Sequence, residues 1–169
     1  MDLMLLEEFY DYKNQLMEDI LTTKSIVDLL GNDVKHNIPA YELAYTQVFP
    51  FEYIPDTVEH SRTYICFDID IQKSANQTYY YPIIYVWIFT HKSLMRLPEG
   101  GVRTDKIAAE LAKKLSGSMM YGLGPLEMYS SKRFAPITDY QGKVLTFNAI
   151  DFNAPKPTKQ PIPSNRKRG

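Results

Sequence analysis

The stretch TYYYPIIYVWIFT at residues 78–90 decides the fold, because it is the strongest strand signal in the chain. It is rich in aromatic and β-branched residues, and its second half is apolar on both alternating faces. A strand of this kind is typical of the centre of a sheet that is covered on both sides. Pro82 has no backbone N–H to donate, so we expect it at a bulge or outside the paired stretch.

The preceding stretch, RTYICFDIDIQ at residues 62–72, alternates with the period of a strand. Its two faces carry Ile65, Phe67, Ile69 and Ile71 on one side and Tyr64, Cys66, Asp68 and Asp70 on the other. The segment KSANQ that follows is typical of a turn. Residues 62–90 are therefore predicted to form a long antiparallel hairpin.

Three segments have helical patterns. Residues 2–21 contain no Gly or Pro, and their apolar residues recur with helical spacing, which predicts an amphipathic helix of about five turns. A short second helix is expected after Thr23 or Ser25 as N-cap, with Gly31 as its stop. Thr104 is the expected N-cap of a third helix, DKIAAELAKKLS.

Further strands are predicted at Leu126–Phe134 and Lys143–Phe152, joined by the turn TDYQG. Val48–Ile54 is either a short edge strand or a packed loop. This order of elements predicts an α+β fold, with a mostly antiparallel sheet of four or five strands around a long central hairpin. The N-terminal helix and a second helix near 104–116 are expected to pack on that sheet.

The composition is that of an ordinary soluble domain, with 169 residues, 44% apolar and 23% charged. Cys66 is the single cysteine, which excludes a disulfide framework and a cysteine zinc site. The longest apolar run, at 79–90, is too short to span a bilayer, so we expect a soluble protein made in a reducing cytoplasm. The 13 tyrosines favour a sheet that binds partners.

Charge divides the chain into two parts. Residues 154–169 are rich in proline and contain five basic residues and no acid: Lys156, Lys159, Arg166, Lys167 and Arg168. Residues 1–153 then hold 14 basic against 20 acidic residues. We therefore predict a single acidic domain at 1–153 and a flexible basic tail at 154–169, which either contacts DNA phosphates or an acidic partner, or only adds solubility.

Catalytic chemistry has one candidate. Asp68 and Asp70 share a strand face about 7 Å apart, and paired carboxylates can hold a divalent metal for phosphoryl transfer. A nuclease motif would need one residue between the second acid and a lysine, whereas two residues separate Asp70 from Lys73. A metal-dependent nuclease or phosphotransferase therefore stays an alternative to a solvated strand face. No nucleotide or dinucleotide motif is present, and we expect no cofactor and no catalytic residue.

Three segments carry a resemblance to a known family: SIVDLLGN after the opening helix, the hairpin RTYICFDIDIQKSANQTYYYPIIYVWIFTHK, and the helix TDKIAAELAKKLSG with the later strand GKVLTFNAIDFN. They resemble the tail terminator family of long-tailed bacteriophages, the tail-completion or head–tail joining proteins of the phage neck. The likeness covers residues 3–153 in the order of elements.

This resemblance implies a virion protein that forms a ring, commonly of six copies. Such a ring caps the tail tube and docks to the head–tail connector, with DNA passing through its lumen, and it involves no membrane. Ring formation needs two complementary patches on each subunit. Phe49, Phe51, Tyr53 and Ile54 are the candidates for one of them. The second alternative is a nucleic-acid-binding module that acts through the basic tail.

Overall fold

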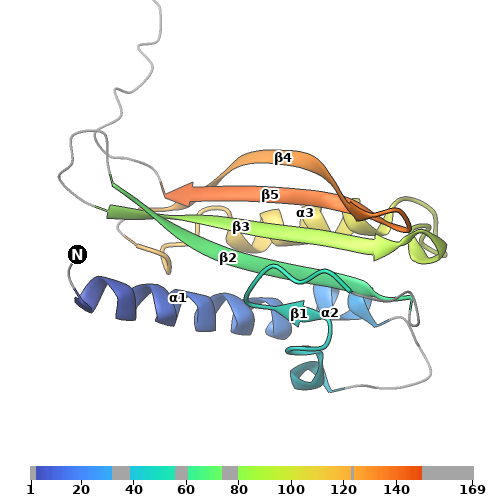
Figure 1. Cartoon of the computed structure of the whole chain (residues 1–169), viewed down its shortest axis with the longest axis horizontal. Coiled ribbons are helices and arrows are strands. Elements are labelled where there is room, and N and C mark those ends of the chain that lie inside the picture. The colour runs from blue at the N-terminus through green and yellow to red at the C-terminus, as the bar shows by residue number, and fades with distance from the viewer. Residues whose placement is uncertain (1–2, 32–38, 56–60, 74–79, 123, 150–169) are drawn as a thin grey trace, which may run out of the picture.

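Five strands form one sheet in the order β1-β2-β3-β5-β4 in the computed structural model, which describes residues 3–31, 39–55, 61–73, 80–122 and 124–149 (Figure 1). The strands are β1 (Val48–Phe49), β2 (Thr63–Lys73), β3 (Tyr80–His91), β4 (Leu126–Ile137) and β5 (Tyr140–Ala149). All neighbouring strands are antiparallel except β1, which runs parallel to β2. The predicted α+β class and mostly antiparallel sheet are confirmed.

The predicted hairpin is the centre of this sheet. β2 and β3 pair without interruption from Thr63 opposite Thr90 to Lys73 opposite Tyr80. β3 lies between β2 and β5, as its apolar sequence predicted. The hydrophobic run at 78–90 therefore marks the central strand.

Pro82 lies inside the paired stretch, opposite Ile71, and not at a bulge as predicted. The N–H of Ile65 donates to the Gln47 carbonyl on the β1 side. The backbone N–H and C=O groups of the odd-numbered residues of β2 therefore point away from β3. Ile71 and Pro82 thus form a pair without hydrogen bonds between them. The nitrogen of Pro82 faces the β5 side, where the ladder begins only at Ile83, so Pro82 lies at the end of that ladder.

The helices are α1 (Leu3–Thr22), α2 (Lys24–Leu30) and α3 (Arg103–Leu115), with single 3-10 turns at Ala40–Leu43 and Lys92–Leu94. The predicted helices are present, but their caps differ. Thr23 precedes α2 without capping it, because its hydroxyl donates to the Asp19 carbonyl of α1 at 2.6 Å. α3 starts after Val102, and Thr104, the predicted cap, is buried inside its first turn.

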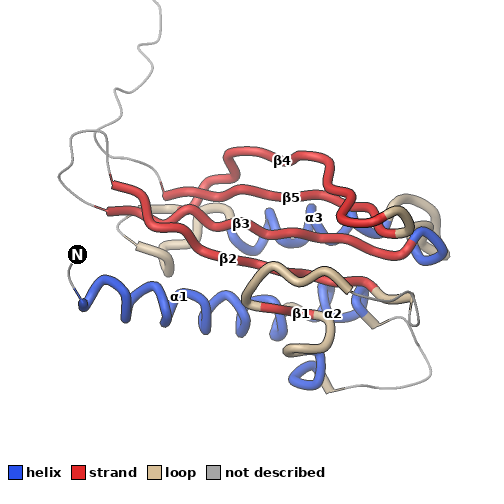
Figure 2. Tube along the Cα trace, in the orientation of Figure 1, coloured by secondary structure: helices blue, strands red, loops and turns tan. Residues whose placement is uncertain are grey.

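The helices cover one face of the sheet, called here the inner face. α3 lies behind β3 and β5, and α1 runs beside β2 (Figures 1 and 2). The main core joins the inward residues of β2, β3 and β5 to the apolar stripes of all three helices. Its largest fully buried members include Phe67, Phe147, Leu16 and Ile26. Burial of these stripes is the main stabilisation of the fold.

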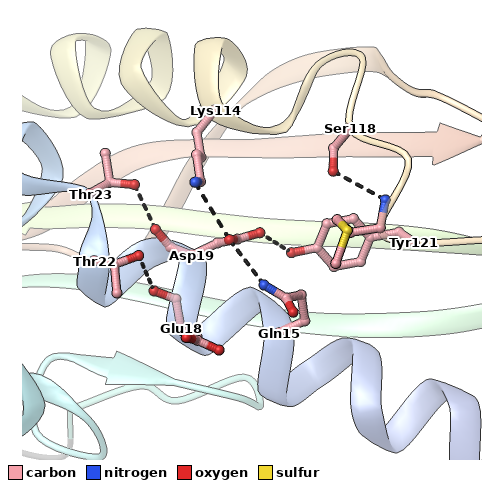
Figure 3. A network of polar contacts seen from close by, with 9 residues as sticks. Gln15, Glu18, Asp19, Thr22, Thr23, Lys114, Ser118 and Tyr121 are labelled. Atoms are coloured by element: carbon pink, nitrogen blue, oxygen red, sulfur yellow. Dashed lines mark hydrogen bonds and ion pairs between the residues drawn. The ribbon is translucent and has the colours of Figure 1, made fainter.

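A polar cluster fixes α1 to α3 and to the segment that follows α3 (Figure 3). The fully buried Tyr121 donates its hydroxyl to Asp19 Oδ2 of α1 at 2.6 Å. The ammonium of Lys114 at the end of α3 lies 3.6 Å from Asp19 Oδ1. Burial, together with the nearby Asp19 carboxylate, raises the pKa of Tyr121, so its hydroxyl stays protonated and donates. The cluster is structural because it links three elements through one carboxylate.

The last strand begins earlier than predicted. TDYQG was expected to be a turn, yet only Thr138 and Asp139 separate β4 from β5. Gly142 belongs to the strand, and a Cβ there would lie 1.7 Å from the Ile88 carbonyl oxygen. Glycine at this position therefore permits the close approach of β3 and β5 and does not mark a turn. The predicted end of the strand at Phe152, and the tail at 154–169, lie outside the described residues.

Candidate interaction surface

The face of the sheet opposite the helices, called here the outer face, is covered over one half only. At the end near Tyr64, Phe89 and Tyr140, the segment after β1 folds over the sheet and makes a second, smaller core. Phe49 and Tyr53 of this segment stack with ring centroids 4.1 Å apart, and Phe49 also contacts Tyr64. This half of the outer face is therefore part of the folded protein and not a free surface.

Burial in this second core changes the acidity of its polar groups. Cys66 is fully buried, and burial raises the pKa of its thiol to about 12. Burial also raises the pKa of Tyr64 to about 12, with further contributions from Tyr140 and Tyr53. Because the thiolate is the nucleophilic form, Cys66 is inert in the folded protein.

The other half of the outer face is open and slightly hollowed. The hollow has a volume of about 310 Å³ and is lined by residues of four strands: Gln72, Tyr81, Ile83, Tyr85, Tyr129, Thr146 and Asn148. The lining combines tyrosine rings and one aliphatic side chain with amide and hydroxyl groups. A lining of this kind suits an apolar side chain of another protein, whose backbone groups can hydrogen-bond to the amides and hydroxyls. The surface is thus suited to contact with another protein.

The β1–β2 edge of the sheet is closed by the chain itself. Beside β1, the Tyr45 N–H donates to the Val48 carbonyl at 2.8 Å. Beyond β1, the carboxylate of Asp68 accepts the Ile69 N–H at 2.8 Å and lies 2.6 Å from Lys13 Nζ. Lys13, which comes from α1, also donates to the Pro50 carbonyl at 3.1 Å. These contacts occupy backbone groups that would otherwise accept an additional strand.

The same contacts fix the position of Asp68, one of the two candidate catalytic residues. Asp68 is held by Lys13 and by the Ile69 N–H, whereas Asp70 is exposed and lies opposite Ile83. Within the described ranges, no three His, Cys, Asp or Glu side chains come together as a metal site. The arrangement gives Asp68 a structural role at the sheet edge.

The opposite edge is formed by β4, and no strand pairs with its outer side among the described residues. The pairing register of β4 with β5 shifts between Met128 and Ser130 and again between Phe134 and Ile137. Such bulges bend an edge and oppose flat pairing with another strand. What β4 presents is its side chains: Met128, Tyr129 at 75% exposure, Lys132 and Arg133. Tyr129 also lines the hollow, so the edge and the hollow form one surface.

The predicted contact residues after β1 fall into two groups. Phe49 is 7% exposed and Tyr53 is half-buried, and both pack inside the protein. Phe51 and Ile54 are exposed at 44% and 42%, and Phe51 lies beside the exposed ring of Tyr45. Only Phe51 and Ile54 are thus placed to meet another molecule. The predicted DNA contacts of the tail, Lys156 to Arg168, lie outside the described residues.

Sequence reasoning missed Tyr45, Tyr129, Lys132 and Arg133 as surface residues. For β4, a signal was present, since MYSSKRF at 128–134 lacks the apolar alternation of a strand covered on one face. For Tyr45, no signal was present, because its exposure follows from the turn before β1, where its φ is 59°. No helix in the described part of the chain is both long and apolar enough to cross a membrane.

Comparisons with known proteins give a family and a structural neighbour. A family model described as YomW matches residues 23–149, which include α2, α3 and every strand. A chain from the solved virion of a native gene transfer agent particle has a similar fold, with a TM-score of 0.53 at 14% identity. That match covers 81% of this chain and 91% of the other chain. No curated protein sequence matches this chain.

Proposed function

The chain belongs to the YomW family, a phage-derived family, and from this membership we propose that it is a structural protein of a virion. The observation that carries the proposal is the fold shared with a chain of a gene transfer agent virion over 91% of that chain. Family and fold together favour a phage particle as its location.

The more specific proposal is that the protein acts in the neck, as the resemblance to tail terminators implies. Copies of the chain form a ring, which in the tail terminator family commonly has six subunits. This ring caps the tail tube and joins it to the head–tail connector. DNA passes through the lumen of this ring. Support comes from the excess of 20 acidic over 14 basic residues in residues 1–153, since a lumen of negative charge repels DNA and lets it slide.

The distribution of exposed apolar side chains also supports assembly. Phe51 and Ile54 are exposed after β1 at one edge of the sheet, and Met128 and Tyr129 are exposed on β4 at the other. Large exposed side chains at both edges of the sheet suit surfaces that other subunits cover. A ring needs two such places because each copy contacts two neighbours.

The proposal assigns the protein no catalytic step. The alternative of a nuclease or phosphotransferase at Asp68 and Asp70 gains no support from the geometry, because Asp68 is engaged by Lys13. The alternative of nucleic-acid binding through the tail rests on Lys156, Lys159 and Arg166 to Arg168, which lie outside the described residues. It stays a prediction from the sequence.

The experiment that tests the proposed function is the mass of the purified full chain by light scattering, followed by negative-stain imaging. Rings with the mass of several 19.6 kDa copies are expected, and these rings should bind the end of tubes when purified tail-tube protein is added. A chain that stays a monomer at high concentration and does not bind the tube ends would contradict the proposal. A nuclease assay with magnesium and manganese on the same sample tests the enzymatic alternative.

A further inference from the structure

We propose that the proline-rich part of the basic tail, PKPTKQPIP at residues 155–163, docks into the hollow on the outer face of its own copy. Tyrosine rings of β3 and β4 line this hollow. Two observations carry the inference: acidic side chains lie on both sides of the hollow, and the described chain ends at its border. The inference goes beyond the proposed virion role and does not depend on the formation of a ring.

Acidic side chains flank the hollow on the β2 side and on the β4 side. The strand register places four residues opposite one another in a single row across the sheet: Asp70, Ile83, Asn148 and Glu127. Ile83 and Asn148 line the hollow, and the two acids lie at the ends of the row. Both acids are exposed, and neither has an ion-pair partner among the described residues. The hollow therefore favours a cationic occupant.

Asp68 and Lys132 also lie on the outer face, but neither reverses this charge. Asp68 is paired with Lys13 of α1, which neutralises it. Lys132 lies opposite Val144, four residues along β5 from the row that the two exposed acids end. At about 3.3 Å per residue, that separation is roughly 13 Å. The charge next to the hollow is therefore negative.

The proline-rich part of the tail has the complementary chemistry. It contains four prolines, Lys156 and Lys159, and no acid. Proline-rich chains favour the polyproline II helix, which docks into grooves lined by aromatic side chains. With three residues per turn and a rise of about 3.1 Å per residue, Lys156 and Lys159 lie on one side of such a helix about 9 Å apart. Asp70 and Glu127, three strand spacings of about 4.8 Å apart, are separated by roughly 14 Å, so one long lysine side chain can meet each acid.

The end of the described chain lies beside the hollow. β5 ends at Ala149, directly after Asn148 of the lining. Residues 150–154 separate Ala149 from the proline-rich part, and this length of chain can extend to roughly 17 Å. β2, at the far side of the hollow, is two strand spacings from β5, or about 10 Å. The proline-rich part can therefore reach the whole hollow of its own copy.

The short connection favours the tail of the same chain over a separate occupant. A segment linked through a few residues has an effective concentration in the millimolar range at its own hollow. Proline also restricts the segment before it docks, which lowers the conformational entropy lost on docking. A separate protein that binds at this hollow must therefore displace the tail.

Tryptic cleavage after Lys159 tests the docking in the full chain. The variant Asp70→Asn with Glu127→Gln loses two exposed ion pairs with the tail and should be cut there at least about threefold faster than the native chain. Cleavage after Arg166, beyond the proline-rich part, should have the same rate in both chains and serves as the internal reference. Equal rates of cleavage after Lys159 would overturn the inference and leave the proposed virion role untouched.

The matched control, Glu7→Gln with Glu18→Gln, removes two exposed acids of α1 and should be cut like the native chain. A control that is cut as fast as the variant of the hollow would assign the effect to net charge and would overturn the inference. Circular dichroism and thermal melting check that each variant folds.

A disulfide trap gives a second readout that does not depend on charge. Ser130 and Ser131 are neighbours on β4, and their register on β5 places Ser130 on the outer face and Ser131 on the inner face. Gln160→Cys is combined with Ser130→Cys in one chain and with Ser131→Cys in another, and the buried Cys66 is left in place. Under mild oxidation, the chain with Ser130→Cys should form a disulfide within one molecule at least about tenfold faster than the chain with Ser131→Cys.

The outcomes of the trap separate docking from mere proximity. Equal rates for the two chains would show that the connection alone brings the cysteines together, and the inference would be overturned. Disulfides that join two molecules would show that the tail docks on another copy, which overturns it as well. Faster trapping at Ser130 within single molecules, in a chain that forms no rings, would support the inference and contradict only the proposed ring.

Discussion

The two edges of the sheet are completed in different ways. At the β1–β2 edge, Lys13, Asp68 and the turn before β1 occupy the backbone groups, and the segment after β1 folds over the outer face. At the β4 edge, two bulges interrupt the strand, and Tyr129, Lys132 and Arg133 project from it. One edge is closed by contacts within the chain, and the other presents side chains to the surroundings.

This difference shows how an edge strand is made available for specific contact. An unprotected flat edge pairs with any other strand and aggregates. The bulges of β4 oppose such pairing, while its side chains keep a defined pattern of charge and ring surface. Recognition through side chains is selective, whereas recognition through backbone hydrogen bonds alone is not. The closed edge, in turn, holds Phe51 in a fixed position for contact.

The largest expected effect separates two phenylalanines of the segment after β1. Phe49→Ala removes a buried ring from the second core and should lower the free energy of unfolding by about 3 kcal/mol. Phe51→Ala, two residues later, removes an exposed ring and should change it by less than about 1 kcal/mol. Urea titrations of both variants measure the difference. Equal losses would mean that Phe51 belongs to the core as much as Phe49.

The second core beneath the closed edge also predicts a dependence on alkaline pH. The pKa values of Cys66 and Tyr64 are raised to about 12 in the folded protein, above their ordinary values of 9.0 and 10.0. Both groups are neutral when protonated, so the unfolded chain loses these protons first. Stability should be constant below about pH 9 and should fall between pH 9 and 12, by up to about 1.4 kcal/mol per pH unit for each group.

Replacement of Cys66 by alanine separates the two contributions to this pH dependence. Cys66→Ala should make the fall between pH 9 and 10 disappear and should make the fall between pH 10 and 12 less steep, leaving the part that belongs to the buried tyrosines Tyr64 and Tyr121. Chemical denaturation at a series of pH values measures both slopes. The same slope in the native chain and in Cys66→Ala would show that the thiol is not buried as the structure has it.

A smaller effect is expected where Lys13 closes the β2 edge. Lys13→Met keeps the length of the side chain but loses the hydrogen bond to Pro50 and the ion pair with Asp68. Because both partners are partly exposed, the loss should be about 1 kcal/mol. Lys24→Met, which breaks an exposed ion pair with Asp28, is the matched control and should cost about 0.3–0.5 kcal/mol. Equal losses in urea titrations would mean that Lys13 does not close the edge.

The smallest effect on stability is expected on β4. Tyr129→Ser removes a ring that is 75% exposed and should change the free energy of unfolding by no more than about 0.5 kcal/mol. The same change should weaken assembly, which sedimentation velocity measures. If the variant assembles normally but unfolds at a lower temperature than the native chain, Tyr129 belongs to the fold and not to the contact surface.

Much of the fold was predictable because its strongest signals are local. The hairpin at 62–90 combines alternation with a run that is apolar on both faces, and neither pattern fits another element. The helix at 2–21 is long and free of glycine and proline. The errors lie where tertiary contacts override local preference. Gly142 was assigned to a turn, although it allows two strands to approach closely.

The contact surface was only partly predictable. The segment VFPFEYI at 48–54 is visibly apolar, and Phe51 and Ile54 are exposed. The burial of Phe49 and Tyr53 depends on the way this segment folds over Tyr64, which no local pattern encodes. The pairing of Asp68 with Lys13 joins residues 55 positions apart in the chain. Sequence reasoning therefore identified the acid but not its role at the sheet edge.

The mass of the native full chain in solution, measured by light scattering over a range of concentrations, tests the central claim most directly. A chain that functions by contact between unlike edges should give a discrete species with the mass of several copies, in equilibrium with a 19.6 kDa subunit. A mass of 19.6 kDa at every concentration, with or without tail-tube protein, would contradict it.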